Sequence, residues 1–315
     1  TLLDIRRQRQ MCIRDRHRAS FDPADLQVDL SGRTILVTGA NSGIGKEVSR
    51  GLAARGAHVW MVCRSEERGE AACAELRTDP DVVASGGVLE VIQCDVSDFG
   101  SIDTFAARLP AKSIDALVHN AGALLSERTL SSDGLELTLA THLVGPLRMT
   151  ASLLEHLGAG SRIVWVSSGG MYTKRLSMDR LSRMSGPFDG VDTYADVKRA
   201  QVVAHEMLAV LLRPRGIARH AMHPGWAATP GVATSIPRFH RATRAILRTP
   251  EQGADTVIWL AACDKLDGRS GEFWFDRSVV PTHLLRSTVE SPAERQALWR
   301  ALVEWSGVGA AFSSN

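Results

Sequence analysis

A chain of 315 residues that is 44% hydrophobic and 23% charged can bury one large core without cross-links or metals. Its five cysteines are scattered singly, without a CxxC pair, which favours a reducing, cytoplasmic location over secretion; no metal site is expected. No apolar run approaches the roughly 18 residues that a membrane-spanning helix needs. We therefore expect a soluble protein.

The small net charge of +2 hides a basic N-terminus. Residues 1–18 carry six Arg against two Asp, which leaves the rest of the chain net negative. Such an arm could bind nucleic acid or an acidic membrane surface, but it has no aromatic residues to stack on bases and no apolar segment typical of a signal peptide. We interpret residues 1–30 as a tail, disordered or artefactual, and expect no nucleic-acid partner.

From residue 31 onward, short apolar runs alternate with amphipathic segments that are long enough to be helices. Continuous apolar runs are typical of strands in a parallel sheet covered on both faces. The runs lie at residues 33–38, 57–63, 88–94, 114–119, 161–167, 217–222 and 271–275. The sequence therefore predicts one doubly wound α/β domain over residues 31–306, with seven mostly parallel strands and a ligand at their carboxyl ends.

A glycine-rich stretch, TGANSGIGKE, follows the first of these runs. A triphosphate-binding loop counted from Gly39 would need Gly at Ile44, and the residue after Lys46 would have to be a hydroxyl residue but is Glu47, so the spacing excludes that class of site. The pattern G-x-x-x-G-x-G does fit, and it opens a helix whose N-terminal amides attract a pyrophosphate. We therefore predict that this turn binds a dinucleotide through Gly39, Asn41, Ser42, Gly43, Ile44 and Gly45.

Residues after the next three strands are candidates for the rest of the cofactor site. Arg64 follows the second strand, where a cation binds a 2′-phosphate and an acidic residue would repel it, so NADP(H) is favoured over NAD(H). The alternative is a solvated surface Arg. Asp95 and Val96 follow the third strand and are expected at the adenine. After the fourth strand, a close turn beside the cofactor is predicted at Asn120, Ala121 and Gly122.

The catalytic candidates lie near the middle of the chain. The stretch YADVK places Tyr194 and Lys198 four residues apart, on one face of a predicted helix. A free tyrosine has a pKa of about 10, and a neighbouring ammonium lowers the pKa by favouring the phenolate. Ser168 ends the fifth strand in VSS, where its hydroxyl could hold a substrate oxygen.

The motifs TGANSGIG, NAG, VSS, YADVK and HPGWAAT, in this order, resemble those of the short-chain dehydrogenase/reductase superfamily. SSGGMY, GPFDG, HPGWAATPGV and GADTVIWLA make the chain most similar to the dehydrogenase/reductase family member 12 branch. The resemblance implies a Rossmann fold and an NADP(H)-dependent alcohol–carbonyl oxidoreductase. Tyr194 would be the general acid/base, Ser168 would orient the carbonyl, and Lys198 would bind the nicotinamide ribose.

The same resemblance implies contacts on the nicotinamide side from Pro224, Gly225 and Thr229. It also implies a homo-oligomer, since members of the superfamily commonly pair through the helices after the fourth and fifth strands.

One position departs from the family pattern, which has Asn three residues before a Gly. Here ATHLVG places His142 before Gly145. If the family Asn acts through its main-chain carbonyl, by holding a water that relays protons to the lysine, His142 can replace it. The imidazole could instead be a tolerated helix residue, or it could relay protons directly.

The substrate lobe is expected from residues 169–193 and 226–249. Met171 and Tyr172 would lie nearest the pocket, with satellite packing as the alternative. Four arginines at helical spacing in the second segment form either a solvated face or a contact for anionic lipid headgroups; they are Arg238, Arg241, Arg244 and Arg248. A lipophilic carbonyl or alcohol is the expected substrate, and peripheral contact the most that is expected with a membrane.

Two alternatives remain open from the sequence. An NADP(H)-binding sensor with little turnover would explain the departure at His142, although it would not need Ser168, Tyr194 and Lys198 together. The C-terminal segment SPAERQALWRALVEW predicts a helix with Leu298, Leu302 and Trp305 on one side. That side packs either on the core or on another subunit.

Overall fold

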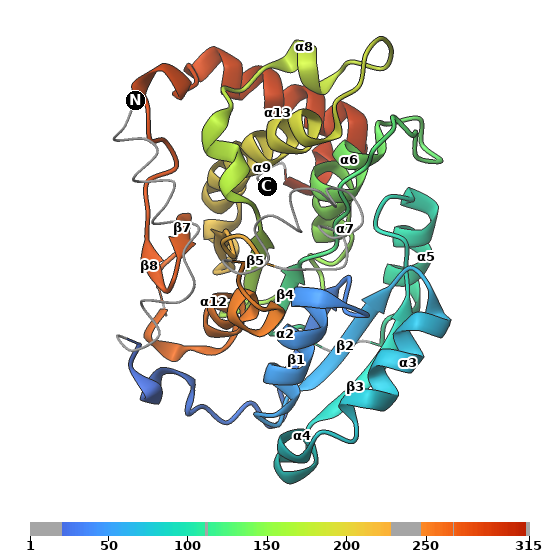
Figure 1. Ribbon diagram of the computed structural model, residues 1–315, viewed down its shortest axis with the longest axis vertical. Helices are drawn as coiled ribbons and strands as arrows, with labels where there is room; N and C mark the ends of the chain where they lie inside the picture. Colours follow the sequence, from blue (N-terminus) through green and yellow to red (C-terminus); the bar gives the residue numbers. More distant parts are fainter. Residues whose placement is uncertain (1–20, 111–112, 228–246, 267, 313–315) are drawn as a thin grey trace.

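The computed structural model describes residues 21–110, 113–227, 247–266 and 268–312, and these form the predicted doubly wound α/β fold (Figure 1). One sheet has the strand order β3-β2-β1-β4-β5-β6-β7-β8. The strands are β1 (Thr34–Thr38), β2 (His58–Cys63), β3 (Val88–Gln93), β4 (Ala116–His119), β5 (Arg162–Val166), β6 (Ala218–Met222), β7 (Glu272–Phe275) and β8 (Ser278–Val279). The order reverses beside β1, where β4 pairs with it, and such a switch point is where open α/β sheets bind ligands.

The seven predicted strands are all present, each within two residues of the predicted bounds. The count of seven was wrong by one, because β8 adds an antiparallel edge strand. Asp276 and Arg277 turn the chain with φ values of 49° and 55°, which pairs Phe275 with Ser278. A strand of two residues is too short to leave a periodic signal in the sequence.

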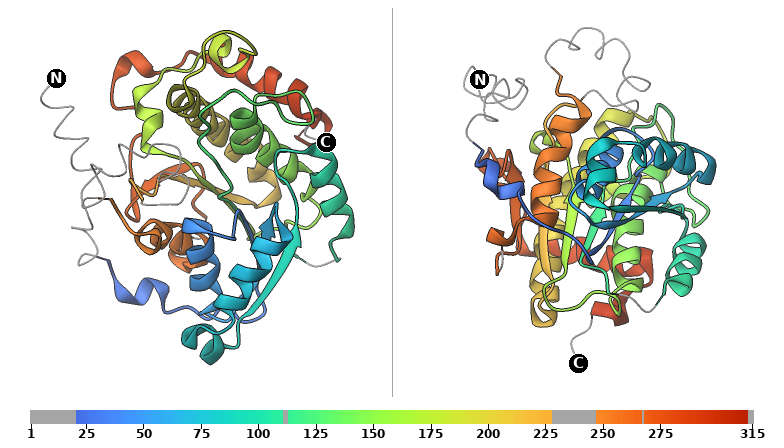
Figure 2. Two further views of the ribbon diagram at one scale, coloured as in Figure 1. Left: turned by 45° about the vertical axis from the view of Figure 1, so that its right-hand side comes forward. Right: turned by 90° about the horizontal axis from the view of Figure 1, so that it is seen from below.

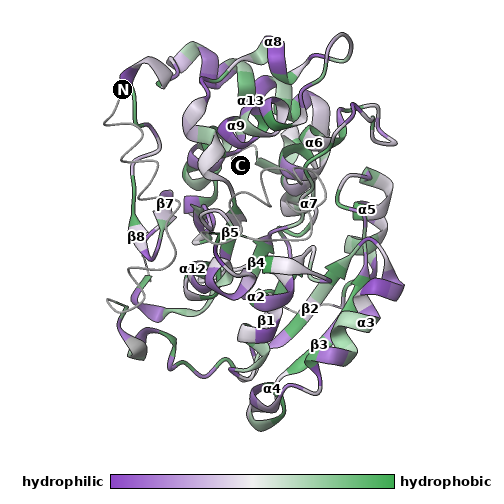
Figure 3. Cartoon of the chain, in the orientation of Figure 1, coloured by the Kyte–Doolittle hydropathy of each residue, from purple (hydrophilic) through white to green (hydrophobic). Residues whose placement is uncertain are grey.

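Helices cover both faces of the sheet (Figure 2). On one face, α2 (Gly43–Ala53), α3 (Glu66–Leu76), α4 (Pro80–Ser85) and α12 (Pro250–Ala262) enclose one hydrophobic cluster. On the other face, α5 (Phe99–Arg108), α7 (Gly145–Ser152), α9 (Gly190–Leu212) and α13 (Pro292–Ser306) enclose a second one. Shorter helices α6 (Leu137–Leu139) and α8 (Met178–Leu181) lie among the connections. The central strands β1, β2, β4 and β5 are hydrophobic and buried along most of their length, as a sheet covered on both faces requires (Figure 3).

The C-terminal helix packs on the core of its own chain. Leu298 and Leu302 of α13 are fully buried in the cluster that also contains residues of α7 and α9, and Trp305 packs against that cluster. A capping box between Ser291 and Glu294 fixes the start of the helix. The apolar side of this helix therefore packs on the core of its own chain and not on another subunit.

Two further observations concern the apolar helices and the cysteines. Among the described residues, none of the helices is both long and apolar enough to cross a membrane. Cys63, Cys73, Cys94 and Cys263 are buried and free, and Cys12 lies outside the described part of the chain.

A buried ion pair lies where the chain segments on either side of residues 228–246 come together. Arg248 is 4% exposed, and its guanidinium bonds both carboxylate oxygens of Asp276, at 2.5 and 2.7 Å. Its backbone N–H donates to Trp226 O, next to the bridge between Ala227 and Arg248. The prediction that Arg248 shares an exposed face with other arginines was wrong, because Asp276 pairs with it from a distant part of the chain. The other members, Arg238, Arg241 and Arg244, lie outside the described residues.

Replacing Asp276 tests how much this pair stabilises the fold. Asn has nearly the shape of Asp and also tolerates the left-handed backbone at this position. The Asp276→Asn substitution therefore leaves the Arg248 charge buried without a countercharge and changes little else. We expect the free energy of unfolding, measured by urea denaturation, to fall by about 3–5 kcal/mol. The matched control is Asp264→Asn, which breaks an exposed pair with Arg33 and should cost less than about 1 kcal/mol. Equal losses in the two variants would contradict this account.

Candidate active site

The glycine-rich turn between β1 and α2 has no room for side chains at two of its glycines. A Cβ on Gly45 would lie 2.3 Å from Gly39 O, and one on Gly39 would lie 2.8 Å from Ala121 Cα. Gly39 and Gly43 also have positive φ values, of 67° and 55°. Ser42 precedes α2 without capping it through its side chain, so the first N–H groups of the helix remain available to an anion. The turn therefore fits a pyrophosphate.

A pair of residues ties this turn to the end of β4. The Thr38 hydroxyl accepts hydrogen bonds from the backbone N–H groups of Asn120 and Ala121, both at 3.0 Å. The Asn120 side chain donates to Thr38 O at 3.0 Å and to Gly39 O at 3.4 Å. The predicted close turn at Asn120, Ala121 and Gly122 thus lies against the glycine-rich turn. Sequence reasoning missed Thr38, although it directly precedes the first glycine of the motif.

The residues predicted at the adenosine end also lie together. Arg64 follows β2 and its side chain is 65% exposed, with Nε 3.9 Å from Asp95 Oδ2. The other oxygen of Asp95 accepts from the backbone N–H and the hydroxyl of Ser97, which fixes the turn after β3. Val96 is buried beneath this turn. The guanidinium of Arg64 therefore remains accessible to a ligand phosphate.

His142 is a buried part of the site. It lies in the π turn Ala140–Val144, and its Nε2 is 2.9 Å from Ala123 O and 3.1 Å from Ala123 N. A Cβ on Gly122 would lie 2.2 Å from the imidazole, which explains the glycine there. The ring stands edge-on to Tyr194, with centroids 5.2 Å apart. Burial and the nearby Lys198 charge hold the pKa of His142 well below its usual range, so the imidazole is neutral at physiological pH.

Ser168 and Tyr194 meet just beyond the end of β5. Burial raises the pKa of Tyr194 to about 12, and a hydrogen bond with the Ser168 side chain acts in the opposite direction. The Ser168 hydroxyl also accepts from Gly170 N at 3.2 Å, which holds it at the start of the following turn. The expected lowering of the Tyr194 pKa is therefore not found, because desolvation of the phenolate outweighs the favourable interactions.

Lys198 lies one turn further along α9. Its Nζ is 5.5 Å from the centre of the Tyr194 ring, and it donates to Val166 O at 2.8 Å. A second bond, at 3.2 Å, goes to Gln201 Oε1. Burial lowers the pKa of Lys198 to about 7. Sequence reasoning missed Gln201, although its position three residues after Lys198 places both on one helix face.

The segment after β6 contributes Pro224 and Gly225. The guanidinium of Arg248 lies beside both, donating to Pro224 O at 3.4 Å, and a Cβ on Gly225 would lie 2.8 Å from Arg248 Nε. The third residue predicted here, Thr229, lies outside the described part of the chain.

Met171 and Tyr172 pack inward. Met171 is fully buried, and the Tyr172 hydroxyl donates to Pro281 O at 2.7 Å while its ring contacts Phe273 edge-on. These contacts favour packing, the alternative reading of the two residues, over a place in the pocket.

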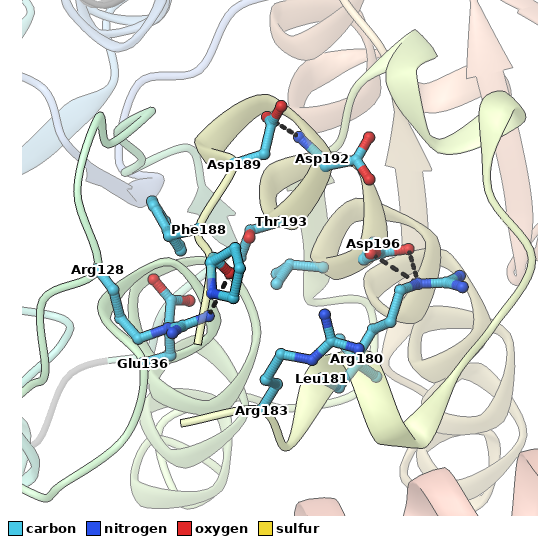
Figure 4. Close-up of a pocket in the computed structure, with 12 residues that line it drawn as sticks. Arg128, Glu136, Arg180, Leu181, Arg183, Phe188, Asp189, Asp192, Thr193 and Asp196 are labelled. Carbon is cyan, nitrogen blue, oxygen red and sulfur yellow. Dashed lines mark hydrogen bonds and ion pairs between the residues drawn. The ribbon is translucent and has the colours of Figure 1, made fainter. Parts of the chain in front are cut away.

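A cavity of about 270 Å³ lies beside the start of α9 (Figure 4). Its walls are charged: Arg180 Nε bonds both oxygens of Asp196 at 2.9 Å, and the Arg128 guanidinium donates to Gly186 O. Tyr194 does not line this cavity, which adjoins Thr193 and Val197 on a neighbouring face of the helix. The cavity is therefore next to the Ser168–Tyr194 pair and does not include it.

The geometry of His142 predicts how a substitution will act. Its ring makes no hydrogen bond to Tyr194 or Lys198 in the part of the chain that the structure describes, so it has no direct path to them. We expect His142→Asn to leave the pH profile of turnover unchanged between about pH 6 and 8, where an accessible imidazole would titrate. The free energy of unfolding should fall by about 1–3 kcal/mol, because Ala123 loses its partner. A displaced pH profile in a folded variant would show that the imidazole transfers protons.

Comparisons with known proteins agree with this geometry. The family model for short chain dehydrogenase matches residues 33–238. Dehydrogenase/reductase SDR family member 12 from Bos taurus is 40% identical over 292 residues, which cover 90% of this chain and 89% of the relative. Retinol dehydrogenase 11 from Mus musculus is 32% identical and the match covers 79% of each chain. The match to the Bos taurus protein confirms the resemblance to the family member 12 branch.

Solved structures share the fold. An uncharacterised protein from Mycobacterium paratuberculosis superposes with a TM-score of 0.72 at 27% identity, covering 91% of this chain and 97% of that one. A short chain dehydrogenase from Burkholderia cenocepacia, solved in complex with NADP, has a TM-score of 0.61 at 28% identity and covers 78% and 96%. The chain therefore belongs to the short-chain dehydrogenase/reductase family of NAD(P)-binding oxidoreductases.

Proposed function

We propose that this protein is an NADP(H)-dependent oxidoreductase that interconverts an alcohol and a carbonyl on a lipophilic small molecule. The observation that carries the proposal is the meeting of Ser168, Tyr194 and Lys198 at the carboxyl end of β5. The glycine-rich turn, which suits a pyrophosphate, lies at the same edge of the sheet. A protein that only bound the dinucleotide would have no need for a phenol, an ammonium and a hydroxyl together.

In the reductive direction Tyr194 is the general acid. When bound, NADPH supplies the hydride that reduces the carbonyl carbon. Tyr194 donates its phenolic proton to the carbonyl oxygen, and the Ser168 hydroxyl orients that oxygen by a second hydrogen bond. A phenol with its pKa raised to about 12 is protonated at neutral pH, which is the form that can donate the proton. Lys198, whose Nζ lies 5.5 Å from the centre of the Tyr194 ring, would offer its remaining N–H donor to the nicotinamide ribose.

Arg64 supports a preference for NADP(H) over NAD(H). Its exposed guanidinium can bond a 2′-phosphate in the bidentate manner that arginine favours. Asp95, 3.9 Å away, partly balances the charge and would repel a phosphate placed on its own side. We assign the remaining cofactor contacts to the glycine-rich turn, to Val96 and the 120–122 turn, and to Pro224 and Gly225.

The lipophilic character of the substrate rests on the relatives, one of which is named for retinol. The substrate lobe would combine residues 169–193 and 226–249, of which 228–246 lie outside the described residues. Contact with anionic lipid stays a prediction, now without Arg248, which is buried. The homo-oligomer also stays a prediction. The sensor alternative depended on His142, and the buried packing of its ring against Gly122 and Ala123 gives this residue a role that needs no loss of catalysis.

The two tyrosines of the chain supply a matched test of the catalytic role. Tyr194→Phe removes the acidic proton, and we expect NADPH oxidation with lipophilic aldehydes and ketones to fall at least about 100-fold. NADPH affinity, measured by fluorescence titration, should stay within about threefold. Tyr172→Phe should cost stability but not turnover, because that hydroxyl bonds only Pro281 O among the described residues. Tight NADPH binding without turnover of any carbonyl by the wild type would favour the sensor instead.

The cofactor preference is tested by reversing the charge at Arg64. We expect Arg64→Asp to weaken NADPH binding by about 10- to 100-fold, with little change or a gain for NADH, because a carboxylate repels the 2′-phosphate and can accept from the 2′-hydroxyl. The control is Arg108→Asp, which makes the same change at an exposed position in the last turn of α5. Equal losses for both dinucleotides would show that Arg64 does not read the phosphate.

A further inference from the structure

The Lys198 ammonium is held by neutral oxygens. The residue is 3% exposed, and within the described part of the chain Nζ bonds Val166 O and Gln201 Oε1 and pairs with none of the carboxylates. An ammonium has three N–H donors, so these two bonds leave one for a ligand. Two carbonyl dipoles thus replace the countercharge that a buried cation usually has.

Gln201 is fixed at both ends of its amide. Its Nε2 donates to His142 O at 2.9 Å, and a carbonyl oxygen can only accept, so the NH₂ group must face His142. Oε1 is then directed to Lys198. The acceptor lies inside the π turn Ala140–Val144, a local widening of the helix that is frequent at functional sites. His142 is in turn held through its imidazole to Ala123.

We infer that Gln201 is a positioning residue: its amide bridges the His142 carbonyl to the Lys198 ammonium and keeps that ammonium in place beside Tyr194. The importance of this bridge for turnover rests on the proposed function. The bridge occupies the link between the His142 carbonyl and the lysine, where the family resemblance suggested a proton-relaying water. An amide holds its N–H protons far more tightly than water does, so Gln201 gives this lysine a fixed partner in place of a relay.

The pKa of the lysine makes the bridge sensitive to substitution. Burial alone lowers the pKa of Lys198 to about 7, close to physiological pH, so small changes in its partners alter the charged fraction strongly. Loss of the Gln201 oxygen disfavours the charged form and lowers the pKa further. A carboxylate at the same position favours the charged form and raises it. Two variants of nearly the same volume therefore move the titration in opposite directions.

The test follows the titration of Lys198 directly. The chain has five lysines, so protein labelled with ¹³C at lysine Cε gives five signals, of which Lys198 is assigned by its loss in Lys198→Arg. We expect Gln201→Leu to lower the pKa of Lys198 by about one unit and Gln201→Glu to raise it by at least one. Gln296→Leu and Gln296→Glu make the same changes on the exposed side of α13 and should leave it unchanged. The pH profile of NADPH oxidation should move in the same direction as each pKa.

The outcomes separate this inference from the proposed function. An unchanged Lys198 titration in folded Gln201→Leu and Gln201→Glu would overturn the bridge, even if Tyr194-dependent turnover is present. Opposite shifts in the two variants would support the bridge, even if none of the carbonyls tested is reduced. Because Gln201→Glu keeps the volume of the side chain and its bond to the buried ammonium, it covers the case in which Gln201→Leu fails to fold.

Discussion

The parallel pairing of β1 with β4 is the constraint on which the candidate active site depends. It brings Thr38 and Asn120, 82 positions apart, to the same edge of the sheet, where they exchange backbone and side-chain hydrogen bonds. The glycine-rich turn and the turn after β4 are therefore one unit. Their closeness is also why Gly39 and Gly45 cannot carry a side chain, since the neighbouring backbone already fills that space. The candidate anion site at the start of α2 thus depends on strand order as much as on the glycine motif.

The long helix α9 serves the site with more than one of its faces. Tyr194, Lys198 and Gln201 follow one another at helical spacing and face the end of β5 and the π turn. Arg199, the residue after the lysine, is fully buried and donates to Met171 O and to Thr282 O. It ties the segment after β5 to the segment after β8. The adjacent cations Lys198 and Arg199 therefore have separate contacts: Lys198 lies in the candidate site, and Arg199 joins two segments of the chain.

Much of this architecture could be predicted from the sequence, and the exceptions have physical causes. Continuous apolar runs reveal buried parallel strands, and the glycine spacing distinguishes a dinucleotide turn from a triphosphate loop. Arg248 was misplaced because helical spacing shows a face but not the distant Asp276 that neutralises it. The charge effect on Tyr194 was misjudged for a related reason: spacing gives proximity to Lys198, whereas the degree of burial, which decides the pKa, depends on the whole fold. The position of Gln201 could have been predicted, since it lies three residues after Lys198 and so on the same helix face.

Burial acts on the pKa values of the two titratable groups of the candidate site in opposite directions. It raises the pKa of Tyr194 to about 12 and lowers that of Lys198 to about 7, because in each case it disfavours the charged form. The phenol is therefore in its protonated form at neutral pH, the form from which it would donate a proton in the proposed carbonyl reduction. Burial of Lys198 also reduces the stability of the fold. The pKa of this lysine is lower in the folded protein than in the unfolded chain, so at a pH between the two pKa values the unfolded chain binds more protons. Its contribution disfavours folding most below about pH 7, and this penalty fades as the pH rises toward the unfolded pKa. A buried ammonium without a carboxylate partner is destabilising, and the bonds that Lys198 makes to Val166 O and to Gln201 Oε1 reduce that penalty without removing the charge.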